Sequence, residues 1–176
     1  MKRILTFLII PIAVFVFQSC EKDEPDCYEP ISILTRNGFV IKEVVEIDSV
    51  RDDILVDTTI ITYRDTGLLQ PIIYSIDLDP NVIIYGEEGV TMMGVPLDPR
   101  REQLSFVLQA DTLEDIRDTL TYFYQSSNHF ISNACGFTNY FLLDSVRSTF
   151  HSLDSIALIS NEVTSGNERH LLLYFF

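Results

Sequence analysis

The alternation of apolar and polar residues after residue 30 predicts a series of short β-strands. The segments are four to ten residues long, rich in β-branched and aromatic side chains, and separated by Asp, Asn, Gly or Pro. The expected strands are 39–47, 54–63, 71–76, 82–85, 90–95, 103–109, 119–125, 129–134, 137–143, 146–150, 155–160 and 169–175. Only residues 113–117 have the composition of a helical turn.

Many short strands with no long amphipathic helix between them are typical of all-β domains. We therefore expect residues 31–176 to form one antiparallel β-sandwich of the immunoglobulin-like type, with a small closed β-barrel as the alternative. Leu104, Phe106 and Leu108 alternate with other residues, which predicts one strongly apolar strand face. Residues 171–176 are apolar on both faces and are expected to form a central strand, covered on both sides.

Residues 1–24 follow a different pattern. Lys2 and Arg3 precede an uncharged apolar run, residues 4–17, which is too short for a comfortable bilayer span. The run ends at Gln18-Ser19-Cys20, where the sequence resembles the lipobox of bacterial lipoproteins, although Phe17 and Gln18 depart from its usual residues. The resemblance implies that residues 1–19 are a signal peptide and that Cys20 carries a diacylglyceryl lipid. An uncleaved anchor or an ordinary secretory signal is the alternative.

Two or three acyl chains would hold the mature chain stably at an outer membrane, whereas one would hold it only weakly. Residues 21–24 resemble the Lys-acidic-acidic export signal of Bacteroidetes surface lipoproteins, so the cell surface and the periplasmic face both stay open. A solvated acidic spacer is the alternative reading. Residues 20–30, with Pro25 and Pro30, have the composition of a linker.

The net charge narrows the choice of partners. The formal charge is −14, and it becomes −16 when Lys2 and Arg3 leave with the signal peptide. Such a chain is repelled by nucleic acid, so no nucleic-acid partner is expected. It is also repelled by anionic headgroups, so we expect the lipid on Cys20, rather than the protein surface, to make the membrane contact.

Two cysteines remain if Cys20 carries lipid. Cys27 and Cys135 would then form an even pair in an oxidising compartment, and they are our disulfide candidates. A disulfide closing so long a loop would stabilise the domain by roughly 3 to 5 kcal/mol. Two unpaired thiols are the alternative.

Candidate catalytic and metal-binding chemistry is sparse. The three imidazoles, His129, His151 and His170, lie in separate expected strands, with no motif spacing between them. Cys135 follows His129, but no third partner is indicated, and no serine lies in a GxSxG elbow. We therefore expect no enzymatic activity and no cofactor.

One acidic segment imitates a calcium loop. Asp77, Asp79, Asn81 and Glu88 have the oxygen-ligand spacing of an EF-hand, but Val82 stands where that loop needs Gly. The flanking segments are also expected strands instead of helices, so we predict no metal site.

The tripeptide Asp-(Ser/Thr)-(aliphatic or Thr) occurs six times. It resembles the acceptor of the general O-glycosylation systems of the same bacteria. The candidate acceptors are Ser49, Thr58, Thr112, Thr119, Ser145 and Ser155. Asp-Ser and Asp-Thr also begin turns through side-chain to backbone hydrogen bonds, and this is the alternative interpretation.

The C-terminal half carries a further resemblance. LSFVLQ, DTLTYFY, FISNACGF, LDSIALIS and ERHLLLYF together resemble an uncharacterised family of small Bacteroidetes lipoproteins. The resemblance implies the compartment of a lipoprotein and a β architecture. No activity follows from it. Within the segments that resemble the family, Gly136 is expected where a turn needs positive φ or where another part of the backbone approaches closely.

We therefore expect a membrane-anchored envelope lipoprotein that serves as a non-enzymatic binding or accessory module for another envelope protein or a glycan. A structural partner of an outer-membrane complex is the alternative, with a calcium-binding protein or a hydrolase acting through Glu87 and Glu88 behind it.

Overall fold

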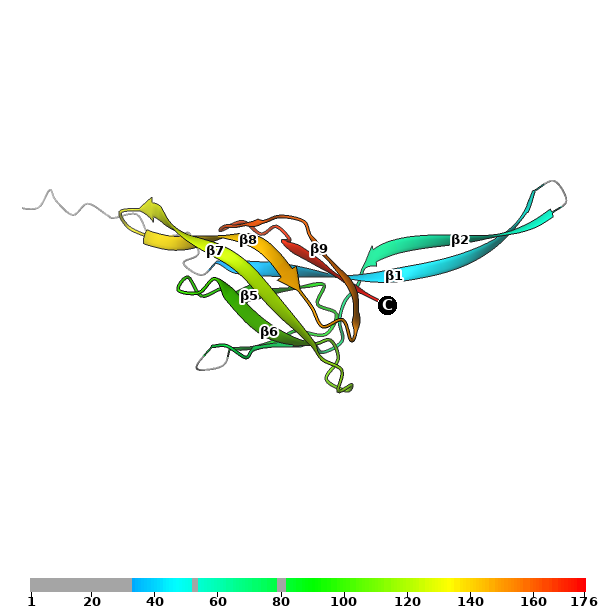
Figure 1. Ribbon diagram of the computed structural model, residues 1–176, viewed down its shortest axis with the longest axis horizontal. Coiled ribbons are helices and arrows are strands. Elements are labelled where there is room, and N and C mark those ends of the chain that lie inside the picture. Colours follow the sequence, from blue (N-terminus) through cyan, green and yellow to red (C-terminus); the bar gives the residue numbers. More distant parts are fainter. Residues whose placement is uncertain (1–32, 52–53, 79–81) are drawn as a thin grey trace, which may run out of the picture.

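The computed structural model describes residues 33–51, 54–78 and 82–176, and these residues form eleven strands in two sheets (Figure 1). One sheet contains β1 (Leu34–Arg51), β2 (Ile54–Asp65), β5 (Met92–Pro96), β9 (Leu153–Leu158) and β11 (Leu171–Phe175). The other contains β3 (Ile72–Ser75), β4 (Ile83–Tyr85), β6 (Gln103–Gln109), β7 (Asp118–Ser132), β8 (Gly136–Arg147) and β10 (Glu162–Val163). The described residues contain no helix.

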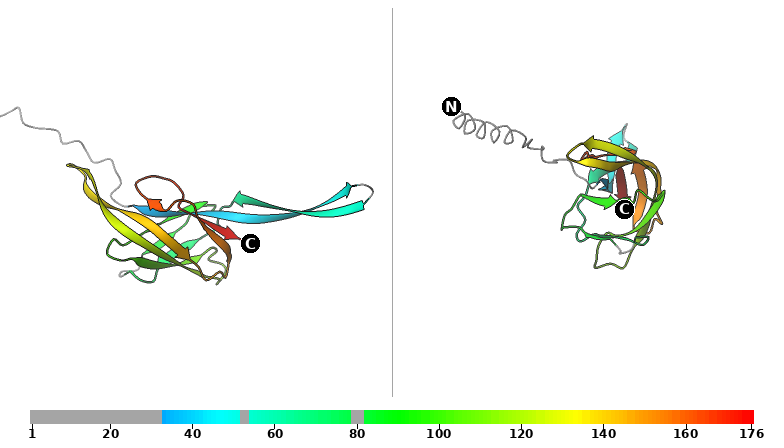
Figure 2. Two further views of the ribbon diagram at one scale, coloured as in Figure 1. Left: turned by 45° about the horizontal axis from the view of Figure 1, so that its top comes forward. Right: turned by 90° about the vertical axis from the view of Figure 1, so that its left-hand side faces the viewer.

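The expected all-β sandwich is confirmed. The first sheet has the order β2-β1-β11-β9, with β5 also paired to β1, and the second has the order β10-β8-β7-β6-β3-β4. Figure 2 shows the second sheet curving around the first. One pair departs from the antiparallel expectation, because β1 and β11 run parallel from Asn37 opposite Leu171 to Ile41 opposite Phe175. Most of the chain separates these strands, so no hairpin turn dictates their direction.

Several expected boundaries were wrong. Residues 119–125 and 129–132 belong to one strand, β7, and the polar residues between them continue its ladder with β8, whereas residues 133–134 lie in the turn after it. The polar residues lie beyond the core, where hydrogen bonds to β8 hold the strand in place. Because neither face is buried there, the sequence shows no alternation of apolar and polar residues. β8 ends at Arg147, so residues 148–150 are not strand, and residues 113–117 form no helical turn. β10 was not expected, because two residues carry no periodicity.

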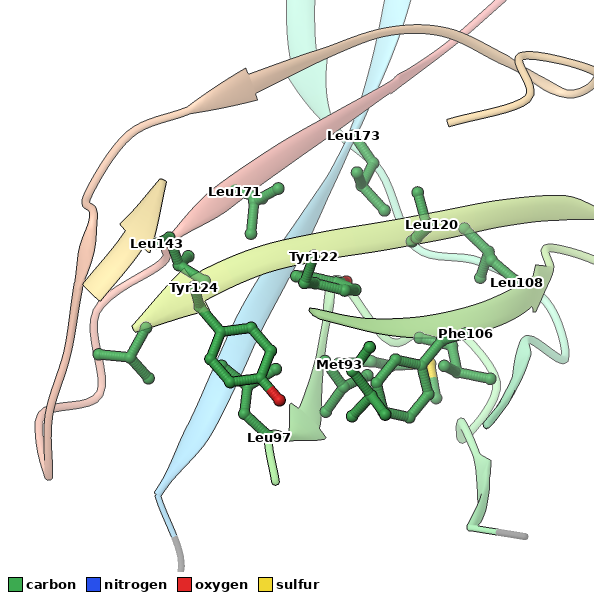
Figure 3. Close-up of a cluster of buried hydrophobic side chains, with 14 of the residues drawn as sticks. Met93, Leu97, Phe106, Leu108, Leu120, Tyr122, Tyr124, Leu143, Leu171 and Leu173 are labelled. Carbon is green, nitrogen blue, oxygen red and sulfur yellow. The ribbon is translucent and has the colours of Figure 1, made fainter. Parts of the chain in front are cut away.

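The core fills the space between the two sheets (Figure 3). Leu104, Phe106 and Leu108 of β6 are fully buried and supply the expected apolar face. From the other sheet, Leu171 and Leu173 of β11 enter the same core. β11 lies between β1 and β9, which confirms the expected central position. Its opposite face is only half-buried, so the expectation of full cover on both sides was wrong.

A buried hydrogen bond joins the two sheets at the centre of the core. Tyr122 Oη of β7 donates to Asn37 Oδ1 of β1 at 3.0 Å, and both side chains are fully buried. Asn37 Nδ2 in turn donates to the Met93 carbonyl oxygen at 3.4 Å. Burial raises the pKa of Tyr122, so the phenol remains a neutral donor. The chain of bonds fixes β7 against β1 and β5.

Replacing Tyr122 with Phe tests this link. The Tyr122→Phe variant leaves Asn37 Oδ1 buried without its donor, which should lower the free energy of unfolding by about 1–3 kcal/mol. Tyr85→Phe is the matched control, since Tyr85 is 70% exposed and should change stability little. Urea unfolding of both variants measures the difference, and equal stabilities would contradict the structural role of the bond.

Candidate functional site

Several predicted site residues lie outside the described part of the chain. Cys20 and Cys27 are among them, so the lipid anchor and the disulfide stay predictions. Cys135 is half-buried in the turn after β7, and its backbone N–H donates to Ser132 Oγ at 3.0 Å. Gly136 has φ 72°, which confirms the expected positive-φ turn. No helix within the described residues has the length and apolarity that a bilayer span requires.

The six candidate glycosylation acceptors lie in different settings. Thr58, Thr112, Ser145 and Ser155 are exposed, Thr119 is half-buried, and Ser49 lies in β1. At residues 111–113 the Asp-Thr pair begins a turn, as in the alternative interpretation, because Asp111 Oδ1 accepts the Leu113 N–H at 2.9 Å. Glycosylation of the acceptors stays a prediction.

Asp77, the first residue of the segment with EF-hand-like spacing, makes a structural hydrogen bond. Asp77 Oδ2 accepts the Ser105 N–H at 2.6 Å, and this bond ties the end of β3 to β6. Asp79 and Asn81 lie outside the described residues. Within the described ranges, no three His, Cys, Asp or Glu side chains lie close enough together to hold a metal ion.

Asp118 organises the loop between β8 and β9. Its buried carboxylate accepts the hydroxyls of Thr149 and Ser152 at 2.9 and 2.6 Å. It also accepts the backbone N–H groups of His151, Ser152 and Leu153 at 2.6 to 3.1 Å. Although burial opposes ionisation, these donors together lower the pKa of Asp118 to about 2.

This Asp, His and Ser cluster is not arranged as a catalytic triad. The Ser152 hydroxyl donates to the carboxylate itself, whereas a triad needs the imidazole between serine and acid. His151 Nδ1 lies 3.4 Å from Asp118 Oδ1 and 2.9 Å from Thr149 Oγ1. The cluster also restrains Phe150, whose φ of 55° is unusual for a bulky residue. Its geometry is that of a loop support.

The other two imidazoles have separate surroundings. His170 is fully buried, and its Nδ1 accepts the Arg36 N–H at 2.9 Å, which joins β1 to the segment before β11. Burial lowers the pKa of His170, so the neutral ring is favoured. His129 of β7 stacks on Tyr140 of β8, with ring centroids 4.2 Å apart.

The feature that sequence reasoning missed is a two-stranded projection, which we call the arm. It consists of residues 42–51 of β1 and 54–63 of β2, which pair along their whole length. At a rise of about 3.3 Å per residue, strands of this length span about 30 Å. Figure 1 shows the arm leaving one end of the molecule, away from every other strand. The sequence predicted strands at 39–47 and 54–63, but nothing in their pattern showed that the sandwich would not cover them.

The arm exposes apolar side chains on both faces. Val44 pairs with Ile61 on one face, and Val45 pairs with Ile60 on the other. Val44 is 55% exposed and Ile61 is 49% exposed. Further exposed residues are Ile47 and Tyr63. A single hairpin with both faces in water is only marginally stable by itself, so the base of the arm must hold it.

Three contacts fix the base of the arm. Arg169 Nη1 and Nη2 donate to the two carboxylate oxygens of Asp65 at 2.8 and 2.7 Å. Tyr63 packs edge-on against Tyr174 of β11, with ring centroids 5.3 Å apart. The Arg169 side chain crosses β1 at Gly38, where an added Cβ would lie 2.9 Å from Arg169 Cδ. Glycine therefore leaves room for the side chain that ties the arm to the body.

Glu43 of the arm forms an ion pair with Arg64, which lies in β2 between the arm and Asp65. They lie on the same face as Val45 and Ile60, next to them along the ribbon. Beyond Glu46 and Thr59 the register continues to Arg51 opposite Ile54. Between residues 58 and 63 the β2 strand carries no charged residue and consists of Thr, Ile and Tyr. Such a strand is prone to pair with another chain.

The fold and the arm define a β-sandwich protein with one projecting hairpin. A family model described as "Family of unknown function (DUF6452)" matches residues 72–175, and this chain belongs to that family. The match runs from the first residue of β3 to the last residue of β11, so β1 and β2 lie outside it. The expectation of an uncharacterised family is confirmed. No curated protein matched the chain, and no solved structure matched it.

Asp118→Asn tests the loop support through its pH dependence. The folded pKa of about 2 lies below the ordinary value of 3.8, so the carboxylate contributes stability above pH 4 that disappears as pH falls toward 2. The variant should lose roughly 2 kcal/mol at pH 7 and little at pH 2. Asp144→Asn, at an exposed carboxylate of β8, is the control. Urea unfolding at both pH values measures this, and an equal loss at pH 2 and 7 would contradict it.

Proposed function

We propose that this protein is a lipid-anchored envelope lipoprotein that works as a non-enzymatic binding module, with the arm as its contact to another envelope protein. The exposed apolar arm carries the binding part of the proposal. A projecting hairpin with Val44, Val45, Ile60 and Ile61 in water has no use within the sandwich, and large exposed apolar surfaces mark interaction sites. The anchor rests on Cys20 at the end of the apolar run.

The edges of the arm favour a protein partner. Among the described strands, β2 pairs only with β1, and β1 beyond Ile41 pairs only with β2. Both outer edges of the arm therefore present backbone donors and acceptors that a partner strand can use. Strand addition to such an edge derives affinity from main-chain hydrogen bonds and specificity from the side chains on each face.

A glycan is less well matched to the arm. Sugar rings stack on flat aromatic faces, and the one aromatic residue of its apolar surface, Tyr63, is engaged edge-on by Tyr174. A permanent structural role in an outer-membrane complex would use the same arm. A structural role differs from an accessory role only in how tightly the arm binds its partner protein.

The settings of the imidazoles support a non-enzymatic role. His170 is buried against Arg36, His151 belongs to the Asp118 loop, and His129 stacks on Tyr140. None of the three has a hydrogen-bonded serine or cysteine nucleophile among the described contacts, as a hydrolase would need. Glu87 and Glu88 are both exposed in the turn before β5.

The anchor is tested by metabolic labelling with radioactive palmitate in the native host. The wild-type chain should carry label and partition into the membrane fraction, because diacylglyceryl and acyl chains give stable attachment. Cys20→Ala should lose the label, while Cys135→Ala should keep it. A Cys20→Ala variant labelled as strongly as the wild type would overturn the lipoprotein assignment.

The arm is tested by co-purification from detergent-solubilised membranes after cross-linking. Ile60→Lys/Ile61→Lys places charge on both faces of the arm, and we expect at least a tenfold loss of the cross-linked partner protein. Leu113→Lys/Ile159→Lys is the matched control, because both residues are exposed apolar positions on the body and the partner should be retained. All variants should unfold at the same urea concentration.

Two results would count against the arm as this contact. One is an Ile60→Lys/Ile61→Lys variant that keeps the partner as well as the wild type. The other is a purified wild-type chain that forms a dimer which the same substitutions abolish, since the arm would then bind a second copy of itself.

A further inference from the structure

The β7–β8 hairpin ends in an uncharged, aromatic tip, residues 126–140. Between Thr119 and Leu143 the chain contains no Asp, Glu, Lys or Arg. With 22% charged residues overall, composition alone would place about five in a stretch of this length. The acidic charge of the protein is therefore absent from residues 119–143, the part of the hairpin that includes the tip.

Aromatic rings occupy both faces of the tip. Phe130 and Phe137 are opposite each other in the ladder, with ring centroids 5.1 Å apart. They are 50% and 65% exposed. On the other face His129 stacks on Tyr140. Asn128 and Asn139, which share the face of the phenylalanines, add uncharged polar groups. Exposed aromatic side chains are favoured in the headgroup region of a bilayer, where their rings reach the boundary of the acyl chains.

The described chain begins at the same end of the molecule. Ile33, its first residue, lines a surface depression together with Thr138 and Asn139 of β8. Thirteen residues connect Cys20 to Ile33, which is at most about 45 Å when fully extended. A lipid on Cys20 therefore holds this end of the sandwich close to the bilayer, with the arm at the opposite end (Figure 1).

The predicted disulfide would bring the anchor closer still. Cys135 lies in the turn of the tip itself, and Cys27 follows Cys20 by seven residues. A Cys27 to Cys135 bond would limit the distance between the lipidated residue and the tip to about 25 Å of extended chain.

We infer that the tip of the β7–β8 hairpin, through Phe130 and Phe137, rests in the headgroup region of the phospholipid bilayer that holds Cys20. The inference rests on the proposed function, because it requires the lipid anchor. It modifies the expectation that only the lipid touches the membrane. Electrostatic repulsion from anionic headgroups acts on the acidic body, whereas the uncharged tip escapes it. Two contacts, lipid and tip, then orient the molecule with its arm pointing away from the membrane.

The chain contains no Trp, so a single introduced Trp reports its own surroundings. The full-length protein carrying Phe137→Trp is purified in its lipidated form and reconstituted into phosphatidylethanolamine and phosphatidylglycerol vesicles with brominated acyl chains. Trp emission should shift to shorter wavelength, and bromine should quench it by about half relative to unbrominated vesicles, as expected for a ring near the acyl boundary. Leu113→Trp is the matched control and should show neither change, because Leu113 is 86% exposed and precedes β7, at the other end of that strand from the tip.

Phe130→Trp is a second reporter at the tip, to be used if Phe137→Trp does not fold. Urea unfolding shows whether each variant is folded. Equal emission of the two tip reporters in brominated and unbrominated vesicles would overturn the inference while palmitate labelling of Cys20 leaves the anchor intact. Absence of that label would overturn anchor and inference together. Emission that responds to soluble oligosaccharides but not to bromine would also overturn it, because the tip would then be a glycan site.

Discussion

The structure depends on the pairing of β1 with three other strands. Its first half lies between β5 and β11, where Asn37 faces Met93 on one side and Leu171 on the other. Its second half leaves both partners and pairs only with β2. One continuous strand thus belongs to the core at one end and to the arm at the other. Because the ladder is continuous, the position of the arm is set by the same hydrogen bonds that hold the sandwich together.

Polar groups in the core make this arrangement specific. Apolar residues from both sheets would pack in several related ways, since burial of area is not directional. The Tyr122 to Asn37 bond is directional, and it joins β7 to the part of β1 that β5 and β11 flank. The carboxylate of Asp118 does the same for the loop before β9. A packing that separated Tyr122 from Asn37, or Asp118 from its donors, would leave a buried polar group without a hydrogen bond. This would cost free energy, so alternative packings are disfavoured.

The two candidate contact surfaces lie at opposite ends of the molecule (Figure 2). The arm exposes aliphatic side chains and open strand edges, whereas the β7–β8 tip exposes aromatic rings without charge. The two surfaces therefore suit different occupants: a protein strand can extend a hairpin edge, and a bilayer interface accepts aromatic rings. The family match covers the tip and leaves the arm outside. In our proposals, membrane contact and partner binding belong to separate parts of one chain.

The sequence by itself determined the all-β class, most strand positions and the turn at Gly136. These features depend on local alternation and on backbone conformations that few residues adopt. The sequence also placed Asp118 in one of six similar Asp-(Ser/Thr) tripeptides. It could not show that this Asp is buried, because the groups that donate hydrogen bonds to its carboxylate come from residues 149–153.

Only the tertiary structure decided which apolar residues are covered. Val44 and Ile61 have the same local pattern as Leu104 and Leu108, yet the first two are exposed and the last two are buried. Likewise, the parallel pairing of β1 with β11 joins the two ends of the described chain, and no local pattern specifies it. Exposure depends on which distant strands lie opposite a residue, and that information is not contained in its neighbours along the chain.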